Sequence, residues 1–316
     1  MVARTRYAPD RGLTARMTAT MFLLGLVFVA FVAAIVFILG AVHASSALIV
    51  LAAVVIGGGL AIGSLFYSDK IALSTAGAVE VTPQQAPELH GVVDRICALA
   101  DMPKPRIAIS PTDLPNAFAT GRNTKHAVLC VTDGLLRRLD REELEGVISH
   151  EMSHVAHKDV MVMTIASFLA IIAGLLIRFS FYGELFGGGR RNSNDQNSGL
   201  ILLAIMAVSI VVYAVSFLLI RLLSRYRELA ADRSGALLTG QPSALASALQ
   251  KVSGTIARIP TKDLREAQPL NAFFFVPALS GRDAGTKIAE LFSTHPPLDK
   301  RLAQLAKISA QLSKQQ

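Results

Sequence analysis

The segment VISHEMSHVAHKDV, residues 147–160, contains the side chains whose types and spacing most clearly predict chemistry. His150, Glu151 and His154 form the pattern H-E-x-x-H in a segment that we expect to be helical. Residues four apart on a helix lie one turn apart on the same face, so both imidazoles can bind one zinc ion. Glu151, next to the first histidine, can then take a proton from a water that the metal activates. The pattern therefore predicts metal-dependent hydrolysis.

A catalytic zinc ion needs a third protein ligand besides the two histidines and keeps one position open. The metzincin continuation of the motif requires a glycine where this chain has His157 and a histidine where it has Val160, so it is excluded. A thermolysin-like glutamate about one helix further on is excluded as well, because Val160 to Ile177 contains no acidic residue. The third ligand must therefore come from elsewhere in the chain.

Four apolar runs indicate an integral membrane protein. Hydrophobic residues make up 52% of the 316 residues, and the mean hydropathy is +0.47, above the values of soluble proteins. The runs, each long enough to cross about 30 Å of hydrocarbon, are Met17 to Val42, Leu48 to Tyr67, Val160 to Ile177, and Gly199 to Ile220. A cleavable signal ending near Ala44 is the alternative for the first run, but the apolar core of a signal has only about 7 to 15 residues.

Basic residues beside these runs predict how the chain crosses the bilayer. Four arginines precede the first run and are expected to stay in the cytoplasm: Arg4, Arg6, Arg11 and Arg16. With four spans, residues 69–158 and everything from Arg221 onward return to that side. The Arg190-Arg191 pair in the outer loop disagrees mildly. Because basic flanks explain the net charge of +8, and the chain has no Trp and few Tyr, no nucleic-acid partner is expected.

The predicted topology selects a third ligand. The third span carries the chain away from the histidines, which separates Glu184 from them by about 30 Å. The fourth span brings the chain back, and Glu228 is the first carboxylate after the return. We therefore predict Glu228 as the third zinc ligand. Asp232, one turn further on, could compete for the metal, but we favour it as an acceptor that orients a ligand histidine.

These features, taken in order, resemble the HtpX family of membrane zinc endopeptidases, which are related to the prenyl-protein endopeptidases. The resemblance covers essentially the whole chain and includes, besides the four spans and H-E-x-x-H, the segment Asn116-Ala117-Phe118-Ala119-Thr120-Gly121, the E-x-x-x-D at Glu228 and Asp232, and His295-Pro296-Pro297. It implies that His150, His154 and Glu228 bind one Zn²⁺ per subunit and that Glu151 is the catalytic base. It also implies cleavage of misfolded or damaged membrane proteins, or unfolded polypeptides, at the cytoplasmic face of the bacterial inner membrane.

The resemblance further implies two sets of substrate contacts. Asn116, Ala117, Phe118, Ala119 and Thr120 resemble an edge strand that holds an extended peptide by backbone hydrogen bonds. An ordinary strand ending in glycine is the alternative. His295 and Arg301 resemble the pair that contacts the substrate carbonyl in prenyl-protein endopeptidases, where such donors stabilise an oxyanion. The alternative is a helix N-terminal turn followed by an arginine on a solvated face.

The expected fold is a mainly α integral membrane protein, with four transmembrane helices and a cytoplasmic α+β metallopeptidase domain of the zincin type that carries a small β-sheet. The expected segments are a basic cytoplasmic N-terminus (1–16), a transmembrane hairpin of two spans (17–68), the first part of the peptidase domain (69–159), the third span (160–178), a flexible outer loop (179–198), the fourth span (199–223) and the second, cytoplasmic part of the peptidase domain (224–316). Periodicity predicts helices at 87–100, 135–139, 142–158 and 227–259, a terminal helix from Leu298, and strands at 106–110, 117–120 and 127–131.

Two other functions stay open at the level of sequence. A catalytically idle membrane chaperone or scaffold with a structural zinc predicts a closed site, with His157 or Asp232 as a fourth ligand. A prenyl-protein endopeptidase uses the same chemistry, but four spans favour it less than a larger set enclosing a chamber. The sequence leaves the oligomeric state open.

Overall fold

The computed structural model describes residues 11–40, 47–187, 196–256, 258 and 295–314. The chain divides into two compact units, each assembled from segments that lie far apart in the sequence. The first unit comprises Met1–Leu13, Phe66–Met161 and Ser224–Gln316, and the second comprises Thr14–Leu65 and Val162–Leu223. Every boundary between the units falls within a long helix.

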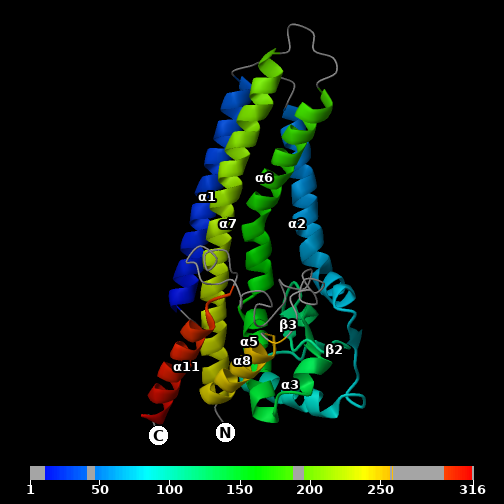
Figure 1. Cartoon of the computed structure of the whole chain (residues 1–316), viewed down its shortest axis with the longest axis vertical. Helices are drawn as coiled ribbons and strands as arrows, with labels where there is room; N and C mark the ends of the chain where they lie inside the picture. The colour runs from blue at the N-terminus through cyan, green and yellow to red at the C-terminus, as the bar shows by residue number, and fades with distance from the viewer. Residues whose placement is uncertain (1–10, 41–46, 188–195, 257, 259–294, 315–316) are drawn as a thin grey trace. The chain divides into compact units, whose positions relative to one another are not determined.

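The second unit consists of apolar helices. Four helices contribute to it (Figure 1): α1 (Arg11–Gly40), α2 (Ala47–Thr75), α6 (Asp159–Gly187) and α7 (Gln196–Thr239). Among the described residues, three segments have the length and composition of membrane spans: Thr14–Ile38, Asp159–Tyr182 and Leu200–Thr239. The second apolar run of the sequence lies within α2.

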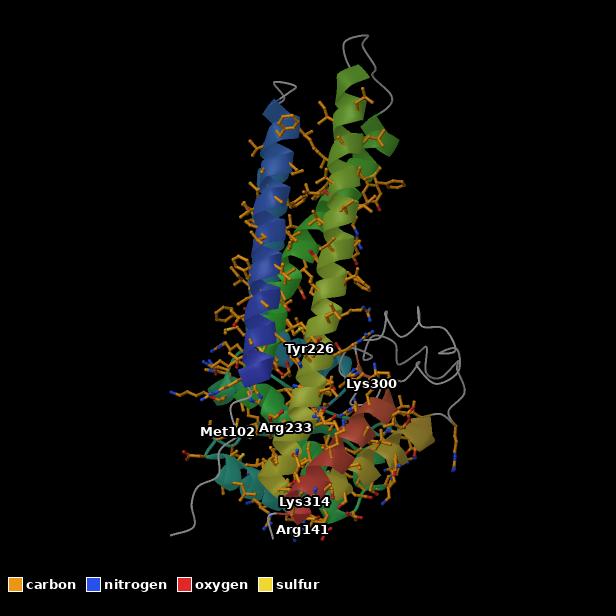
Figure 2. All side chains as sticks on the ribbon, turned by 90° about the vertical axis from the view of Figure 1, so that its left-hand side faces the viewer. Met102, Arg141, Tyr226, Arg233, Lys300 and Lys314 are labelled. Atoms are coloured by element: carbon orange, nitrogen blue, oxygen red, sulfur yellow. The ribbon has the colours of Figure 1, made fainter. Side chains whose placement is uncertain are left out.

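The apolar side chains of this unit face both inward and outward. Buried residues of α1, α6 and α7 form one cluster, which includes Phe31, Ile172 and Ile205. Other large apolar side chains are exposed, such as Phe37 at 78% and Leu200 at 68%. Figure 2 accordingly shows mainly carbon along α1 and the apolar part of α7. Helices that are hydrophobic all round are typical of membrane spans.

The first unit contains a small mixed sheet. Its strands are β1 (Val79–Glu80), β2 (Arg106–Ser110), β3 (Ala117–Thr120) and β4 (Val128–Thr132). The strand order is β1-β2-β4-β3, with β2 and β4 parallel and the other pairs antiparallel. Strand β3 therefore forms one edge of the sheet. Its turn into β4 requires Gly121, whose φ is +132° and where an added Cβ would lie 2.3 Å from the carbonyl oxygen of His126.

Helices pack around this sheet and around one another to form the core of the first unit. Besides the end of α7, they are α3 (Pro87–Ala100), α4 (Asp133–Leu136), α5 (Arg141–Ala156), α8 (Pro242–Ile256) and α11 (Leu298–Ser313). Fully buried core residues include Ile96 of α3, Leu129 of β4, Ile148 of α5 and Leu249 of α8. Helix α5 begins with a capping box between Asp140 and Glu143, which satisfies backbone donors at its first turn.

Most predicted elements of the first unit agree with the structure to within a few residues. The helix at 87–100 and the strands at 106–110 and 117–120 are found with those bounds, whereas β1 was not predicted. The helical segment predicted at about 227–259 is helical but divided, because α7 runs unbroken from the apolar run to Thr239 and α8 starts at Pro242. Gly240, with φ at +70°, ends α7. Residues 188–195 of the predicted outer loop lie outside the described residues, whereas residues 179–187 and 196–198 belong to α6 and α7.

A close approach of α7 to α5 depends on Gly235. A Cβ at this position would lie 3.0 Å from the backbone nitrogen of His150 and 3.2 Å from its Cα. The hydroxyl of Ser149 also donates to the carbonyl oxygen of Gly235, at 3.3 Å. A side chain at residue 235 would require the backbone of α5 to shift by a few tenths of an ångström, so Gly235 favours this close spacing between the helices.

We predict that Gly235→Ala destabilises the protein by about 1–3 kcal/mol, because the added methyl group overpacks the contact with α5. Thermal unfolding of the detergent-solubilised protein measures this as a lower Tm. The matched control is Gly254→Ala in α8, where no atom lies within 4 Å of the added Cβ. There we expect no loss, or a gain of about 0.5–1 kcal/mol from helix propensity. Equal Tm values for the two variants would contradict the close-packing argument.

Candidate metal centre

Three buried side chains from two helices of the first unit converge on one point. His150 and His154 lie one turn apart on α5, and Glu228 lies on α7. Each offers a ligand atom, and these atoms all lie within 4.8 Å of one another. The three residues are between 1% and 9% exposed. The structure therefore brings together the three side chains that the sequence predicts as metal ligands.

The spacing of the donor atoms fits a zinc ion. Nε2 of His150 lies 3.7 Å from Oε2 of Glu228, and Nε2 of His154 lies 3.5 Å from Oε1 of Glu228. Donors bound tetrahedrally at about 2.0–2.2 Å are separated by about 3.3–3.6 Å. Two imidazoles and one carboxylate are also a donor set that catalytic zinc sites use.

The buried charges around this point also favour a divalent cation. Four carboxylates and two guanidinium groups surround it: Glu151, Asp159, Glu228 and Asp232, with Arg227 and Arg301. With neutral histidines and all four carboxylates ionised, these described side chains carry a net charge of −2. Uncompensated buried charge is costly, and a divalent cation at the histidines balances it.

The pKa of His150 reflects the same excess of negative charge. Burial by itself lowers this pKa, but the neighbouring carboxylates of Asp232 and Glu228 outweigh burial and raise it to about 9. Metal binding requires the neutral imidazole and therefore competes with this proton.

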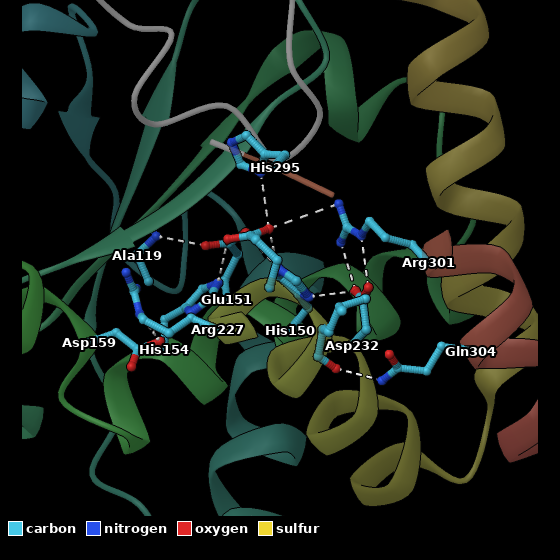
Figure 3. A network of polar contacts seen from close by, with 12 residues as sticks. Ala119, His150, Glu151, His154, Asp159, Arg227, Asp232, His295, Arg301 and Gln304 are labelled. Atoms are coloured by element: carbon cyan, nitrogen blue, oxygen red, sulfur yellow. Dashed lines mark hydrogen bonds and ion pairs between the residues drawn. The ribbon is translucent and has the colours of Figure 1, made fainter. Parts of the chain in front are cut away.

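A carboxylate and an arginine support His150. Nδ1 of His150 lies 2.9 Å from Oδ1 of Asp232. Arg301 of α11 donates to both oxygens of Asp232, each at 2.7 Å (Figure 3). Gln304, one turn further along α11, donates to the carbonyl oxygen of Leu229. The structure thus places Asp232 where the sequence analysis expects an acceptor for a ligand histidine.

His154 has a matching pair of supports, which the sequence analysis did not assign to the site. Nδ1 of His154 lies 2.6 Å from Oδ2 of Asp159, and Nε of Arg227 lies 2.9 Å from the same oxygen. The sequence shows Asp159 shortly after the second histidine and Arg227 directly before Glu228, and these positions were the only hints of the pair. Neither signal predicts that the two side chains meet.

Glu151 lies between the three candidate metal ligands and the edge strand. Its Oε2 accepts a hydrogen bond from the backbone N–H of Ala119, at 3.1 Å (Figure 3). Burial raises the pKa of the Glu151 carboxyl, while the charges of His150 and His154 act in the opposite direction. A buried carboxylate with a raised pKa, beside a metal site, is suited to general-base catalysis.

The hydrogen-bond pattern of β3 explains why Ala119 faces Glu151. Thr132 donates its backbone N–H to the carbonyl oxygen of Asn116, at 3.0 Å. Because antiparallel strands pair through alternate residues, the backbone groups of Ala117 and Ala119 point away from β4, toward the edge of the sheet. The edge strand therefore presents backbone groups beside Glu151.

The other two predicted substrate contacts, His295 and Arg301, lie close to Glu228. Nδ1 of His295 lies 3.1 Å from Oε2 of Glu228, and Nη1 of Arg301 lies 4.0 Å from the same oxygen. Arg301 is 2% exposed, so it does not lie on a solvated face. His157 is the C-cap of α5 and does not join the group of ligand atoms among the described residues.

Comparisons with known proteins agree with this chemistry. The model of peptidase family M48 matches residues 83–309. Protease HtpX homolog 1 of Streptomyces coelicolor is 57% identical over 309 residues, covering 98% of this chain and 97% of the relative. Protease HtpX homologs of Moorella thermoacetica and Methanosarcina mazei are 49% and 46% identical, each over 98% of this chain and over 98% and 100% of the relatives. The crystal structure of S. mikatae Ste24p gives a TM-score of 0.49 at 16% identity, over 94% of this chain and 66% of that one. The chain therefore belongs to peptidase family M48 and is an HtpX-family metalloprotease of the membrane.

Proposed function

We propose that His150, His154 and Glu228 bind one Zn²⁺ and that Glu151 is the catalytic base of an endopeptidase. The observation that carries this proposal is the convergence of three buried donors, whose ligand atoms lie within 4.8 Å of one another, beside the buried carboxylate of Glu151. The proposed substrates are misfolded or damaged membrane proteins and unfolded polypeptides, cleaved at the cytoplasmic face of the membrane.

The catalytic cycle follows from the position of Glu151. When bound, the zinc ion supplies a Lewis acid that lowers the pKa of a water to about 7 and polarises the scissile carbonyl. Glu151 removes a proton from the attacking water and passes it to the leaving amine as the C–N bond breaks. The N–H of Ala119 holds one oxygen of Glu151, which fixes the direction in which the carboxylate faces.

We propose that β3 binds the substrate as an added strand. The backbone groups of Ala117 and the carbonyl group of Ala119 point toward the edge of the sheet, where an extended peptide can pair with them, while the N–H of Ala119 holds Glu151. Because Ala119 contacts Glu151, a peptide bound there passes next to the catalytic base. This geometry supports the substrate-binding role predicted for residues 116–120.

A structural zinc in an idle scaffold is less well supported. Such a site needs four protein ligands, and the described residues provide a group of three. Asp232, the carboxylate that this alternative would use as a fourth ligand, is held by two hydrogen bonds from Arg301 and contacts Nδ1 of His150, on the other side of the imidazole from Nε2.

We predict that Glu151→Gln keeps one zinc per protein and loses peptide cleavage by about 10²-fold or more, because the amide cannot accept the proton of the water. Metal analysis and peptide hydrolysis by the purified protein in detergent measure both quantities. Cleavage at the wild-type rate would refute the assignment of the base. Loss of zinc together with activity would instead show that Glu151 supports metal binding.

We predict that Ala119→Pro lowers kcat/KM by about tenfold or more with unchanged zinc content, because proline removes the N–H at the edge of β3. The hydrogen bonds between β3 and β4 do not involve this N–H, so the sheet should persist. Ala119→Ser keeps the N–H and is the matched control, with kcat/KM near that of the wild type. Equal kcat/KM for the proline and serine variants would show that the N–H of Ala119, which holds Glu151, is not needed for catalysis.

We also propose four spans, the second within α2, with the N-terminus and residues 69–159 and 224–316 in the cytoplasm. The basic residues before the first apolar run support this orientation.

The proposed orientation predicts that a membrane-impermeant maleimide labels Ser193→Cys in intact cells and labels Lys300→Cys only after permeabilisation. Lys300 is exposed on α11 (Figure 2), and the native Cys97 and Cys130 are buried. The opposite labelling pattern would invert the topology.

A further inference from the structure

We propose that Asp159 and Arg227 are positioning residues for the metal centre: Asp159 fixes the imidazole of His154, and Arg227 fixes Asp159. The inference rests on the proposed zinc site, in which His154 binds the metal through Nε2. A histidine that binds through Nε2 must carry its proton on Nδ1, and an acceptor at Nδ1 selects this tautomer. Oδ2 of Asp159, 2.6 Å from Nδ1 of His154, is that acceptor.

The pair at His154 repeats the arrangement at His150, with one difference. At His150, Asp232 uses both carboxylate oxygens to accept hydrogen bonds from Arg301. At His154, the single oxygen Oδ2 of Asp159 faces both the imidazole and the guanidinium group of Arg227. The position of this oxygen therefore depends directly on Arg227, so we expect the orientation of His154 to respond to substitution of the arginine.

The backbone around Asp159 is arranged to bring its carboxylate back to α5. Helix α5 ends at Ala156, and Asp159 is the first residue of α6. Between them, Lys158 has φ at +57°, a left-handed conformation that residues other than glycine adopt infrequently. This turn brings Asp159 against the histidine five residues before it. Strained backbone of this kind persists where the surrounding contacts require it.

Arg227 connects the orientation of His154 to the placement of the third ligand. It directly precedes Glu228 on α7, so the contact of Arg227 with Asp159 also limits how Glu228 can move relative to α5. Asp159 is 1% exposed and the side chain of Arg227 is 11% exposed. Buried ion pairs add little to stability after the cost of desolvation, so a positioning role explains this pair better than stability does.

The test is the zinc affinity of the full-length protein in detergent, measured by competition with a chelator. We expect Asp159→Asn to raise the Kd for zinc by about 10- to 100-fold. Arg227→Gln should raise it by a smaller factor, and Arg227→Lys should restore part of the loss because an ammonium group can still contact Asp159. The double variant Asp159→Asn/Arg227→Gln should match Asp159→Asn alone, because Arg227 acts through Asp159. The visible spectrum of the Co²⁺-loaded Asp159→Asn protein should also differ from that of the wild type.

The control is Asp94→Asn on α3. This substitution breaks an exposed ion pair in which Oδ1 of Asp94 lies 2.8 Å from Nζ of Lys104. It should leave the Kd and the Co²⁺ spectrum unchanged. If Asp159→Asn lowers the Tm but keeps the wild-type Kd and spectrum, the pair is only structural and the proposal is wrong. If Asp159→Asn does not fold, a wild-type Kd for Arg227→Gln overturns the proposal in the same way. Glu228→Ala separates failure of the positioning proposal from failure of the proposed zinc site. Unchanged zinc binding in that variant would refute His150, His154 and Glu228 as the ligand set.

Discussion

The close approach of α5 to α7 is the constraint on which the candidate metal centre depends. Gly235 of α7 lies against the backbone of His150, and the acidic residues one and two turns before it, Asp232 and Glu228, therefore face the histidines of α5. The two helices come from distant parts of the sequence, and neither carries a complete ligand set alone. A wider spacing would separate the carboxylate from both imidazoles at once.

This contact gathers more charge than a protein interior ordinarily holds. His150 and His154 each contact an aspartate through Nδ1, and each aspartate contacts an arginine. Removing these groups from water costs free energy, which their mutual hydrogen bonds offset only in part. A bound divalent cation neutralises excess negative charge at this point, so the metal is expected to stabilise the fold as well as to take part in hydrolysis.

The sheet contributes by bringing the edge strand β3 to Glu151, the proposed catalytic base. Strand β3 uses one side for β4 and directs Ala119 toward Glu151. Recognition through backbone groups depends little on the side chains of the substrate. That property suits a protease whose proposed substrates share an unfolded or damaged state rather than a sequence.

The sequence by itself determined the features that depend on local spacing and on the order of apolar runs. H-E-x-x-H predicted which side chains share a helix face, and the return of the chain after the fourth apolar run pointed to Glu228. Strand and helix periodicity located α3, β2 and β3. The break at Gly240 was missed because the helical pattern continues on both sides of it.

Only the tertiary structure decided which polar groups meet across elements. The contact between Asp159 and Arg227 joins residues separated by 68 positions, and nothing in either local sequence specifies the other. Arg301 likewise contacts Asp232 instead of solvent because the packing of α11 against the rest of the first unit buries it. Local patterns determine what a segment can become, whereas the partners of a buried charge are set by how the segments pack.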